Sequence, residues 1–187
     1  MKNKIWEAAK PALILMLVAA VAAAALAGVN ALTASTIARR AEETANIARR
    51  EVMDADRFEE QTLTDASGNA VTYYTALDAD GETVGYVFTA TATGKSGGLV
   101  VMTGIAANGK VTGVSVIEEN ETAGYVDKVE KAGLLESFVG KVAALFESGK
   151  DVDTVAQATK TSKGVIDGVN KAVSYYELLT KGEMSDG

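Results

Sequence analysis

Threonine, serine and lysine residues cluster in a short segment near the C-terminus, directly before the last stretch with the apolar periodicity of a helix. Residues 153–162 have the sequence DTVAQATKTS, and a helical pattern follows them directly. Hydroxyl groups and backbone N–H groups therefore meet at the positive end of a helix, which is a natural place for an anion. Lys160 and Lys163 add positive charge to an otherwise acidic chain and favour a phosphate group. The structural alternative is that Thr161 or Ser162 only caps the helix.

Two further polar segments contain glycine, the residue that allows a backbone to approach a ligand closely. Residues 94–98 have the sequence GKSGG, and residues 118–124 have the sequence EENETAG. Each has a plain structural interpretation when taken alone, because paired glycines also form β-bulges and the acidic segment can form a simple turn. Each becomes informative only beside the other two segments.

The composition excludes several kinds of chemistry. The 187 residues contain no cysteine and no histidine, which removes thiolate and imidazole metal sites, His-ligated haem and nucleophiles that need a Cys or His partner. The formal charge of −7 argues against a general nucleic-acid binder, because a polyanion would be repelled. With 48% hydrophobic residues the chain can build one good core, and redox chemistry would need a bound cofactor.

The N-terminal region is predicted to be a transmembrane anchor over residues 1–37. Residues 11–38 carry no charge, and about 20 helical residues suffice to cross a hydrocarbon core of about 30 Å. The alternative is a cleaved signal peptide, since Lys2 and Lys4 resemble the basic start of one. Residues 1–10 carry a charge of +2 (three Lys, one Glu), whereas residues 38–187 carry −9 (15 basic, 24 acidic). We therefore expect a single-pass protein of the cell membrane, with a short cytoplasmic N-terminus and its long acidic part outside the cytoplasm.

An α+β domain is predicted over residues 60–187, after a helical stalk over residues 38–59. Runs rich in Val, Thr and Tyr between glycine-containing turns indicate strands over residues 71–77, 83–91, 99–106 and 111–117. Helical periodicity returns in residues 125–139 and again after Ser162, where Val165, Val169, Val173 and Tyr176 form one stripe. Consecutive strands joined by short turns predict an antiparallel meander. Strands followed by helices predict that the helices pack on one face of the sheet.

In this order the three polar segments resemble the FMN-binding domain shared by the G subunit of the bacterial Rnf electron-transport complex and the C subunit of the sodium-pumping NADH:quinone reductase. In that family an N-terminal span ends in Asn-x-x-Thr, which Asn30 and Thr33 fit. A glycine-rich segment before a strand corresponds to residues 94–98. A Glu-Thr-Pro-Gly loop corresponds to residues 121–124, with Ala123 in the place of proline.

The family's flavinylation signature is an Asp followed by Ser/Thr-Gly-Ala-Thr-x-Thr/Ser. Residues 153–162 fit this signature, apart from Ala156 and Gln157 in the place of the Ser/Thr-Gly pair. The resemblance implies that Thr159 carries FMN through a phosphoester bond. It places the other cofactor contacts at Ser96, Gly97, Gly98, Glu121, Thr122, Gly124, Gln157, Ala158, Lys160, Thr161 and Ser162. Tyr73, Tyr74 and Tyr125, the last in the place of a usual leucine, could stack on the flavin, and core packing is the alternative for each.

The resemblance implies a membrane-anchored flavoprotein subunit that relays electrons in an ion-translocating ferredoxin:NAD oxidoreductase complex. Its partners would be the other membrane subunits and a flavin transferase that attaches FMN. No side chain is expected to act as an acid, base or nucleophile, and no metal site is expected. The alternatives are the C-type subunit of the quinone reductase, a stand-alone flavin domain in extracellular electron transfer, and a non-redox anchored binding domain outside the cytoplasm.

Overall fold

The computed structural model describes residues 15, 16, 18–23, 26, 28, 43, 45–119 and 124–183. The chain forms two compact units, Met1–Ala45 and Asn46–Gly187. The predicted anchor, residues 1–37, lies mostly outside the described residues. Within the described part of the chain, no helix combines the length and the hydropathy that a membrane crossing requires. Residues 46–59, predicted as part of a separate stalk, belong to the second unit.

A five-stranded antiparallel sheet forms the centre of the second unit. Its strands lie side by side in sequence order, which confirms the predicted meander. They are β1 (Arg57–Thr64), β2 (Ala70–Leu77), β3 (Thr83–Thr93), β4 (Gly98–Ala106) and β5 (Val111–Glu119). The sequence does not predict β1, because its residues are mostly polar and exposed and lack an apolar alternation.

The first two hairpin turns share one design, in which an aspartate and a glycine fix the chain reversal. In the β1–β2 turn the Asp65 carboxylate accepts hydrogen bonds from the backbone N–H groups of Ser67 and Asn69, both at 2.8 Å. The bonds from Asn69, its backbone N–H first, hold the pKa of Asp65 below its usual value. Asp78 accepts two equivalent bonds in the β2–β3 turn. Because these turns are local, the sequence alone predicts the meander.

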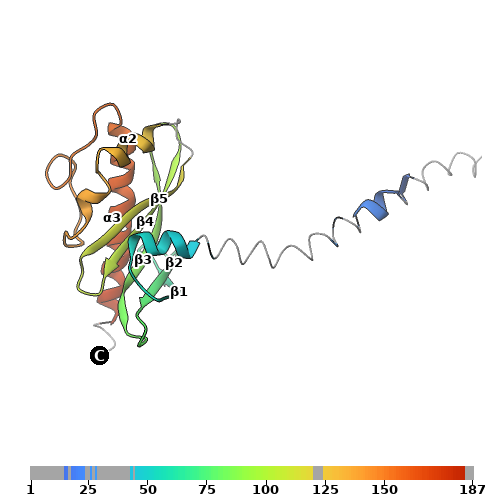
Figure 1. Cartoon of the computed structure of the whole chain (residues 1–187), viewed down its shortest axis with the longest axis horizontal. Helices are drawn as coiled ribbons and strands as arrows, with labels where there is room; N and C mark the ends of the chain where they lie inside the picture. Colours follow the sequence, from blue (N-terminus) through green and yellow to red (C-terminus); the bar gives the residue numbers. More distant parts are fainter. Residues whose placement is uncertain are drawn as a thin grey trace, which may run out of the picture. The chain divides into compact units, whose positions relative to one another are not determined.

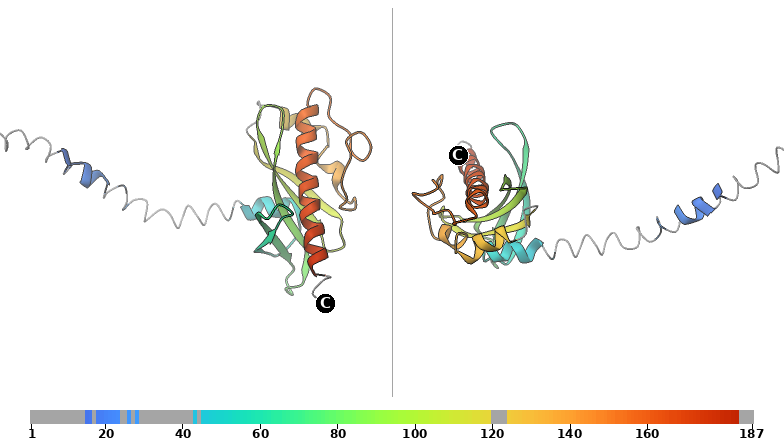
Figure 2. Two further views of the ribbon diagram at one scale, coloured as in Figure 1. Left: turned by 180° about the vertical axis from the view of Figure 1, so that it is seen from behind. Right: turned by 90° about the horizontal axis from the view of Figure 1, so that it is seen from above.

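Helix α3 (Thr159–Glu183) lies along the concave face of the sheet, and the strands curve around it (Figures 1 and 2). On this face the sheet supplies large buried side chains and the helix supplies glycine. A Cβ on Gly168 would lie 2.6 Å from Val101 Cγ2, and one on Gly164 would lie 2.8 Å from the Thr93 carbonyl oxygen. The missing side chains therefore let α3 approach the sheet closely. The predicted core stripe is fully buried at Val165, Val169 and Val173.

The helix predicted over residues 125–139 is interrupted. α2 (Tyr125–Lys131) ends at Ala132, and a short 3-10 helix, η1 (Glu136–Phe138), follows it. Gly133 has a φ of 75°, and its N–H donates to the Glu130 carbonyl oxygen at 2.8 Å. The next N–H, of Leu134, donates to the Val129 carbonyl oxygen at 3.2 Å. This Schellman arrangement ends helices at glycine, so the prediction of one continuous helix is wrong.

The convex face of the sheet carries a second contact. Helical residues 46–52 end there, and Thr112 Oγ1 donates a hydrogen bond of 2.5 Å to the Val52 carbonyl oxygen. Three neighbouring strands present glycine to this segment, at Gly85, Gly104 and Gly113. A Cβ on Gly113 would lie 2.6 Å from Val52 Cα, so only glycine allows the approach. Helical segments therefore cover both faces of the sheet (Figure 2). The two helices that follow the strands, α2 and α3, contribute to one core cluster, as expected for helices on one face, and the segment that ends at Val52, predicted to be part of the stalk, belongs to the other cluster.

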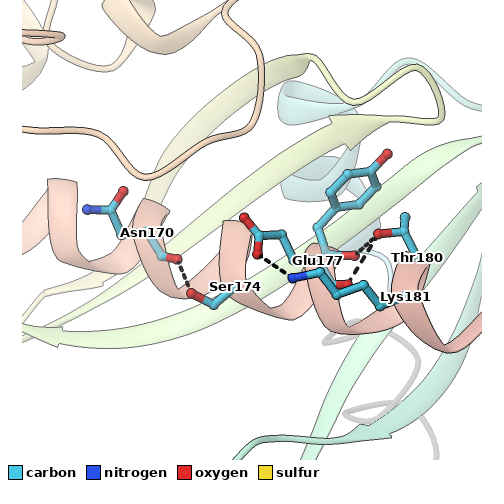
Figure 3. Close-up of polar contacts among 6 residues, drawn as sticks. Asn170, Ser174, Glu177, Thr180 and Lys181 are labelled. Atoms are coloured by element: carbon cyan, nitrogen blue, oxygen red, sulfur yellow. Dashed lines mark hydrogen bonds and ion pairs between the residues drawn. The ribbon is translucent and has the colours of Figure 1, made fainter.

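The outward face of the C-terminal half of α3 satisfies its polar groups within the helix (Figure 3). Ser174 Oγ and Thr180 Oγ1 each donate to the carbonyl oxygen four residues earlier, both at 3.0 Å. Lys181 Nζ lies 3.1 Å from Glu177 Oε2, an ordinary exposed pair. This half of the helix therefore has a plain structural role.

Candidate functional site

The hydroxyl of Thr159 lies at the exposed start of α3. Thr159 is the first residue of the helix and is exposed, whereas Ala158 before it is buried. The Ser162 N–H donates to the Ala158 carbonyl oxygen at 2.8 Å, so the N–H groups of Thr159 and Lys160 precede the bonded part of the helix. The first turn has no acidic residue, and Lys160 and Lys163 are both exposed beside it. Cations at the positive end of a helix destabilise it, so this arrangement favours a bound anion.

Ser162 holds the loop in front of the helix. Its side chain is fully buried, and its Oγ accepts a hydrogen bond from the Val155 N–H and donates one to the Ala158 carbonyl oxygen, both at 3.0 Å. The Ala158 N–H donates to the Val155 carbonyl oxygen at 3.0 Å. Thr161 is also fully buried. Ser162 therefore positions the loop that leads to Thr159, and it is Thr159 and Lys160 that face solvent.

Gln157 is the one non-glycine residue with a positive φ in the described ranges, at 64°. Its side chain is exposed. The left-handed conformation costs a residue with a Cβ about 1 kcal/mol or more, whereas glycine adopts it readily. The signature that residues 153–162 resemble has glycine at this position, and a left-handed turn would favour glycine there. This chain makes the same turn with glutamine at a cost in backbone strain.

Two of the three predicted segments meet the same end of the sheet. Gly164 of α3 packs on the turn over residues 94–98, because a Cβ there would lie 3.2 Å from Gly94 Cα. The turn is closed by a hydrogen bond of 2.9 Å from the Gly94 N–H to the Gly97 carbonyl oxygen. Ser96 is exposed, and Gly97 and Gly98 are half-buried.

The residue that follows the third segment, Tyr125, contacts this turn. Lys95 Nζ donates a hydrogen bond to the hydroxyl of Tyr125, the first residue of α2, and lies 4.0 Å from the centre of its ring. Gly124 precedes α2 with a φ of 83°, which glycine readily supplies. Glu121 and Thr122, the other predicted contacts of this segment, lie outside the described residues. Tyr73 and Tyr74 lie on β2, where Tyr73 is a core residue stacked on Phe88 at 5.6 Å between ring centres.

Residues 94–174 match the family described as "FMN-binding domain", and residues 1–52 match the one described as "RnfG N-terminal region". Over 92% of its length the chain is 32% identical to the G subunit of the "Na(+)-translocating ferredoxin:NAD(+) oxidoreductase complex" of Acetobacterium woodii, and it covers 93% of that protein. The chain belongs to the Rnf G-subunit family.

Other relatives in the Rnf G-subunit family match over a shorter stretch. The G subunit of the "Ion-translocating oxidoreductase complex" of Pseudomonas aeruginosa is 32% identical over 44% of this chain and 43% of that protein. Its counterpart in Erwinia tasmaniensis is 32% identical over 48% of this chain and 47% of that protein. The crystal structure of Shewanella oneidensis NqrC is 20% identical, with a TM-score of 0.45 and 65% of each chain covered.

Beside the start of α3 this Rnf G-subunit family member also has an open pocket of about 520 Å³. It lies between the turn after α2 and the loop over residues 151–156, and Gly133, Ser137, Lys141 and Asp153 are among its lining residues. A small molecule would fit this volume. Thr159 is not among its lining residues, so the pocket lies near the Thr159 hydroxyl and does not enclose it.

Sequence reasoning missed the residues that bring the segments together. Gly164 and Gly168 are spaced by four in α3, and Ala172 continues the row. That spacing is a recognisable signal, because small residues four apart on a helix mark a close approach to another element. The contact between Lys95 and Tyr125 joins residues thirty positions apart. No local pattern predicts it.

Proposed function

We propose that this Rnf G-subunit family member is a membrane-anchored flavoprotein that relays electrons through covalently held FMN in an ion-translocating ferredoxin:NAD oxidoreductase complex. Its membership of the family and the "FMN-binding domain" match over residues 94–174 support the cofactor and the complex. The observation that carries the proposal is the exposed hydroxyl of Thr159 at the start of α3, beside two lysines and no first-turn carboxylate. The two lysines and the first N–H groups of the helix can stabilise the negative charge of a phosphate ester at Thr159.

Attachment would form a bond between Thr159 Oγ and the flavin-side phosphorus of a flavin dinucleotide and break the bond from that phosphorus to the bridging oxygen of the diphosphate, so that a nucleoside monophosphate leaves and the hydroxyl proton is released. A flavin transferase is the partner that would catalyse this transfer. Lys160 and the first N–H groups of α3 would neutralise the phosphate. Gln157, Ala158, Thr161 and Ser162 would shape and hold the acceptor turn. The contacts along the ring would come from Ser96, Gly97, Gly98, Glu121, Thr122 and Gly124.

Bound FMN supplies the redox chemistry. The chain contains no Cys and no His, so neither a thiol nor an imidazole-bound metal can serve as a redox centre. The residues of this chain would bind and orient the flavin, and none is proposed as an acid, base or nucleophile. A tether through the phosphate end keeps the cofactor on the protein and leaves its ring available to neighbouring cofactors. The flavin domain, proposed over residues 60–187, would therefore act as a relay by proximity.

We further propose that residues 1–37 are a single-pass anchor in the cell membrane, with the short N-terminus in the cytoplasm and the flavin domain outside it. Residues 38–59 would connect the two, with residues 46–59 already part of the folded unit. The Ala-rich anchor would meet the other membrane subunits of the complex, since small residues allow close helix packing. The length of the match to the Acetobacterium woodii protein favours this complex over the quinone reductase.

The test is flavin that stays on the protein after denaturation. The full chain is produced with a flavin transferase, and in-gel flavin fluorescence is compared between wild type, Thr159→Ala, Thr159→Ser and Thr154→Ala. We expect loss of the signal in Thr159→Ala alone, because serine retains a hydroxyl and Thr154 lies outside the first turn of α3. Fluorescence that survives in Thr159→Ala would show that the flavin is attached at another site. Absence of fluorescence from the wild type would contradict covalent attachment and support a non-redox binding domain.

A further inference from the structure

Two lysines, Lys95 and Lys128, lie close to the ring of Tyr125, beside the turn over residues 94–98. Lys95 Nζ lies 4.0 Å and Lys128 Nζ lies 5.2 Å from the centre of the Tyr125 ring. Both lysines are exposed, and Tyr125 is half-buried. Within the described ranges, no salt bridge joins either ammonium group to a carboxylate. Two like charges held close together repel each other, so the cluster becomes favourable when negative charge is placed beside it.

The cluster is within reach of a ligand tethered at Thr159. Gly164 follows Thr159 by five residues, about 7.5 Å along the helix axis, and it packs directly on Gly94, the neighbour of Lys95. Helix α2, which begins with Tyr125, lies at the same end of the sheet as the start of α3 (Figure 1). A ligand tethered at Thr159 and extended toward Gly164 would therefore approach the turn that carries Lys95.

We infer that Lys95, held in place by Tyr125, is an electrostatic tuning residue for the flavin, whose positive charge raises the flavin's reduction potential. This inference rests on the proposed function. Uptake of two electrons and one proton by oxidised flavin leaves one additional negative charge on the ring. Lys95 favours that negative charge, so it shifts the equilibrium toward the reduced state without taking part in the electron transfer itself.

Tyr125 is a positioning residue in this arrangement. A lysine on an exposed turn has many accessible rotamers, and it spends little time in one place unless it is held. The Tyr125 hydroxyl accepts a hydrogen bond from Lys95 and its ring offers a cation–π contact. A leucine at this position would provide neither interaction. The tyrosine therefore gives this chain a fixed positive charge at the turn.

The flavin ring could instead extend into the pocket of about 520 Å³, which is lined by a different lysine. Lys141 lines that pocket and donates a hydrogen bond to the Asp151 carbonyl oxygen. The two placements of the flavin ring predict that different lysines affect its reduction potential. A ring beside the 94–98 turn responds to Lys95, whereas a ring in the pocket responds to Lys141.

The experiment is a spectroelectrochemical titration of the flavinylated full chain, with dithionite as the reductant. Lys95→Met should shift the equilibrium between reduced and oxidised flavin about tenfold toward the oxidised form, which is about 30 mV for a two-electron couple. Tyr125→Leu should give much of the same shift, and Lys95→Arg should keep the wild-type potential. Lys150→Met, an exposed lysine paired with Glu147, is the matched control and should change nothing. At about 1 M salt the shift should shrink, because exposed charges are screened.

The outcomes separate the inference from the proposal on which it rests. Covalent flavin in wild type with the same potential in Lys95→Met and Lys150→Met overturns the tuning role alone. A shift in Lys141→Met with none in Lys95→Met overturns it too and places the ring in the pocket. The absence of covalent flavin from wild type contradicts the proposed function instead, and the flavin content of each denatured sample shows which case applies.

Discussion

The two faces of the sheet meet helical segments in opposite ways. On the concave face the sheet carries large side chains such as Val101, and the glycines that allow close approach lie on the helix, at Gly164 and Gly168. On the convex face the strands carry the glycines, among them Gly113, and the approaching partner is the backbone at Val52. In each case glycine stands where the other element needs room.

This difference separates two tasks. The concave face buries the long apolar stripe of α3 and leaves the exposed start of that helix, with Thr159, at the end of the sheet where the β3–β4 turn lies. The convex face fixes the last residues before β1, where Arg49 is only 4% exposed and lies 3.5 Å from the centre of the Tyr74 ring. One face therefore presents the candidate ligand site, and the other fastens the segment that leads back to the N-terminal region.

The largest effect is expected on the convex face. In Gly113→Ala the new Cβ would lie 2.6 Å from Val52 Cα and 2.8 Å from its carbonyl oxygen, and backbone atoms cannot move aside by changing rotamer. We expect the free energy of unfolding to fall by about 3 kcal/mol, measured by urea denaturation. The control is Gly98→Ala, whose Cβ would make an ordinary contact at 3.9 Å and should cost about 0.5 kcal/mol or less. Equal stability of the two variants would contradict the close approach of Val52.

A smaller loss is expected on the concave face. In Gly168→Ala the new Cβ meets side-chain atoms of Val101, at 2.6 Å from Cγ2, and the gain in helix propensity offsets part of the clash. We expect a loss of about 1 to 2 kcal/mol. Val101→Ala is itself costly because Val101 is fully buried, and it should cost less in the Gly168→Ala background than in wild type because it makes room for the new Cβ. A double-mutant cycle in urea with no coupling would show that the two residues do not limit each other.

The smallest effect is a gain in stability in the loop that precedes α3. Gln157 holds a φ of 64°, so Gln157→Gly should relieve backbone strain and stabilise the protein by about 0.5 to 1 kcal/mol. Gln157→Ala serves as the comparison, since it shortens the side chain and keeps the strain. Thermal unfolding should therefore rank glycine above both glutamine and alanine. A melting temperature that is unchanged or lower in the glycine variant would contradict a strained turn.

The sequence predicts the parts of the fold that are built from local patterns. The turns at Asp65 and Asp78 carry their own hydrogen bonds, and the stripe at Val165 and Val169 has the period of a helix, so the meander and α3 are predictable. It does not predict β1, whose side chains are largely polar, or the end of α2 at Gly133, which depends on a left-handed residue that the apolar period does not record.

The candidate site divides in the same way. The segment proposed to carry FMN, residues 153–162, is recognisable because its hydroxyls precede a helix, and the structure places Thr159 at that helix start. Which hydroxyls face solvent is a matter of packing, and the burial of Thr161 and Ser162 follows from contacts that no sequence pattern displays. The contact of Lys95 with Tyr125 depends on how two distant segments meet at one end of the sheet.

The most direct test of covalent flavin attachment is mass spectrometry of the full chain purified from a host that contains its flavin transferase. The intact mass should exceed that of the polypeptide by one esterified FMN. Fragmentation should place the added mass on the peptide that spans residues 150–163, at Thr159. An intact mass equal to that of the bare polypeptide, or an adduct on any other residue, would contradict the assignment of Thr159 as the flavin attachment site.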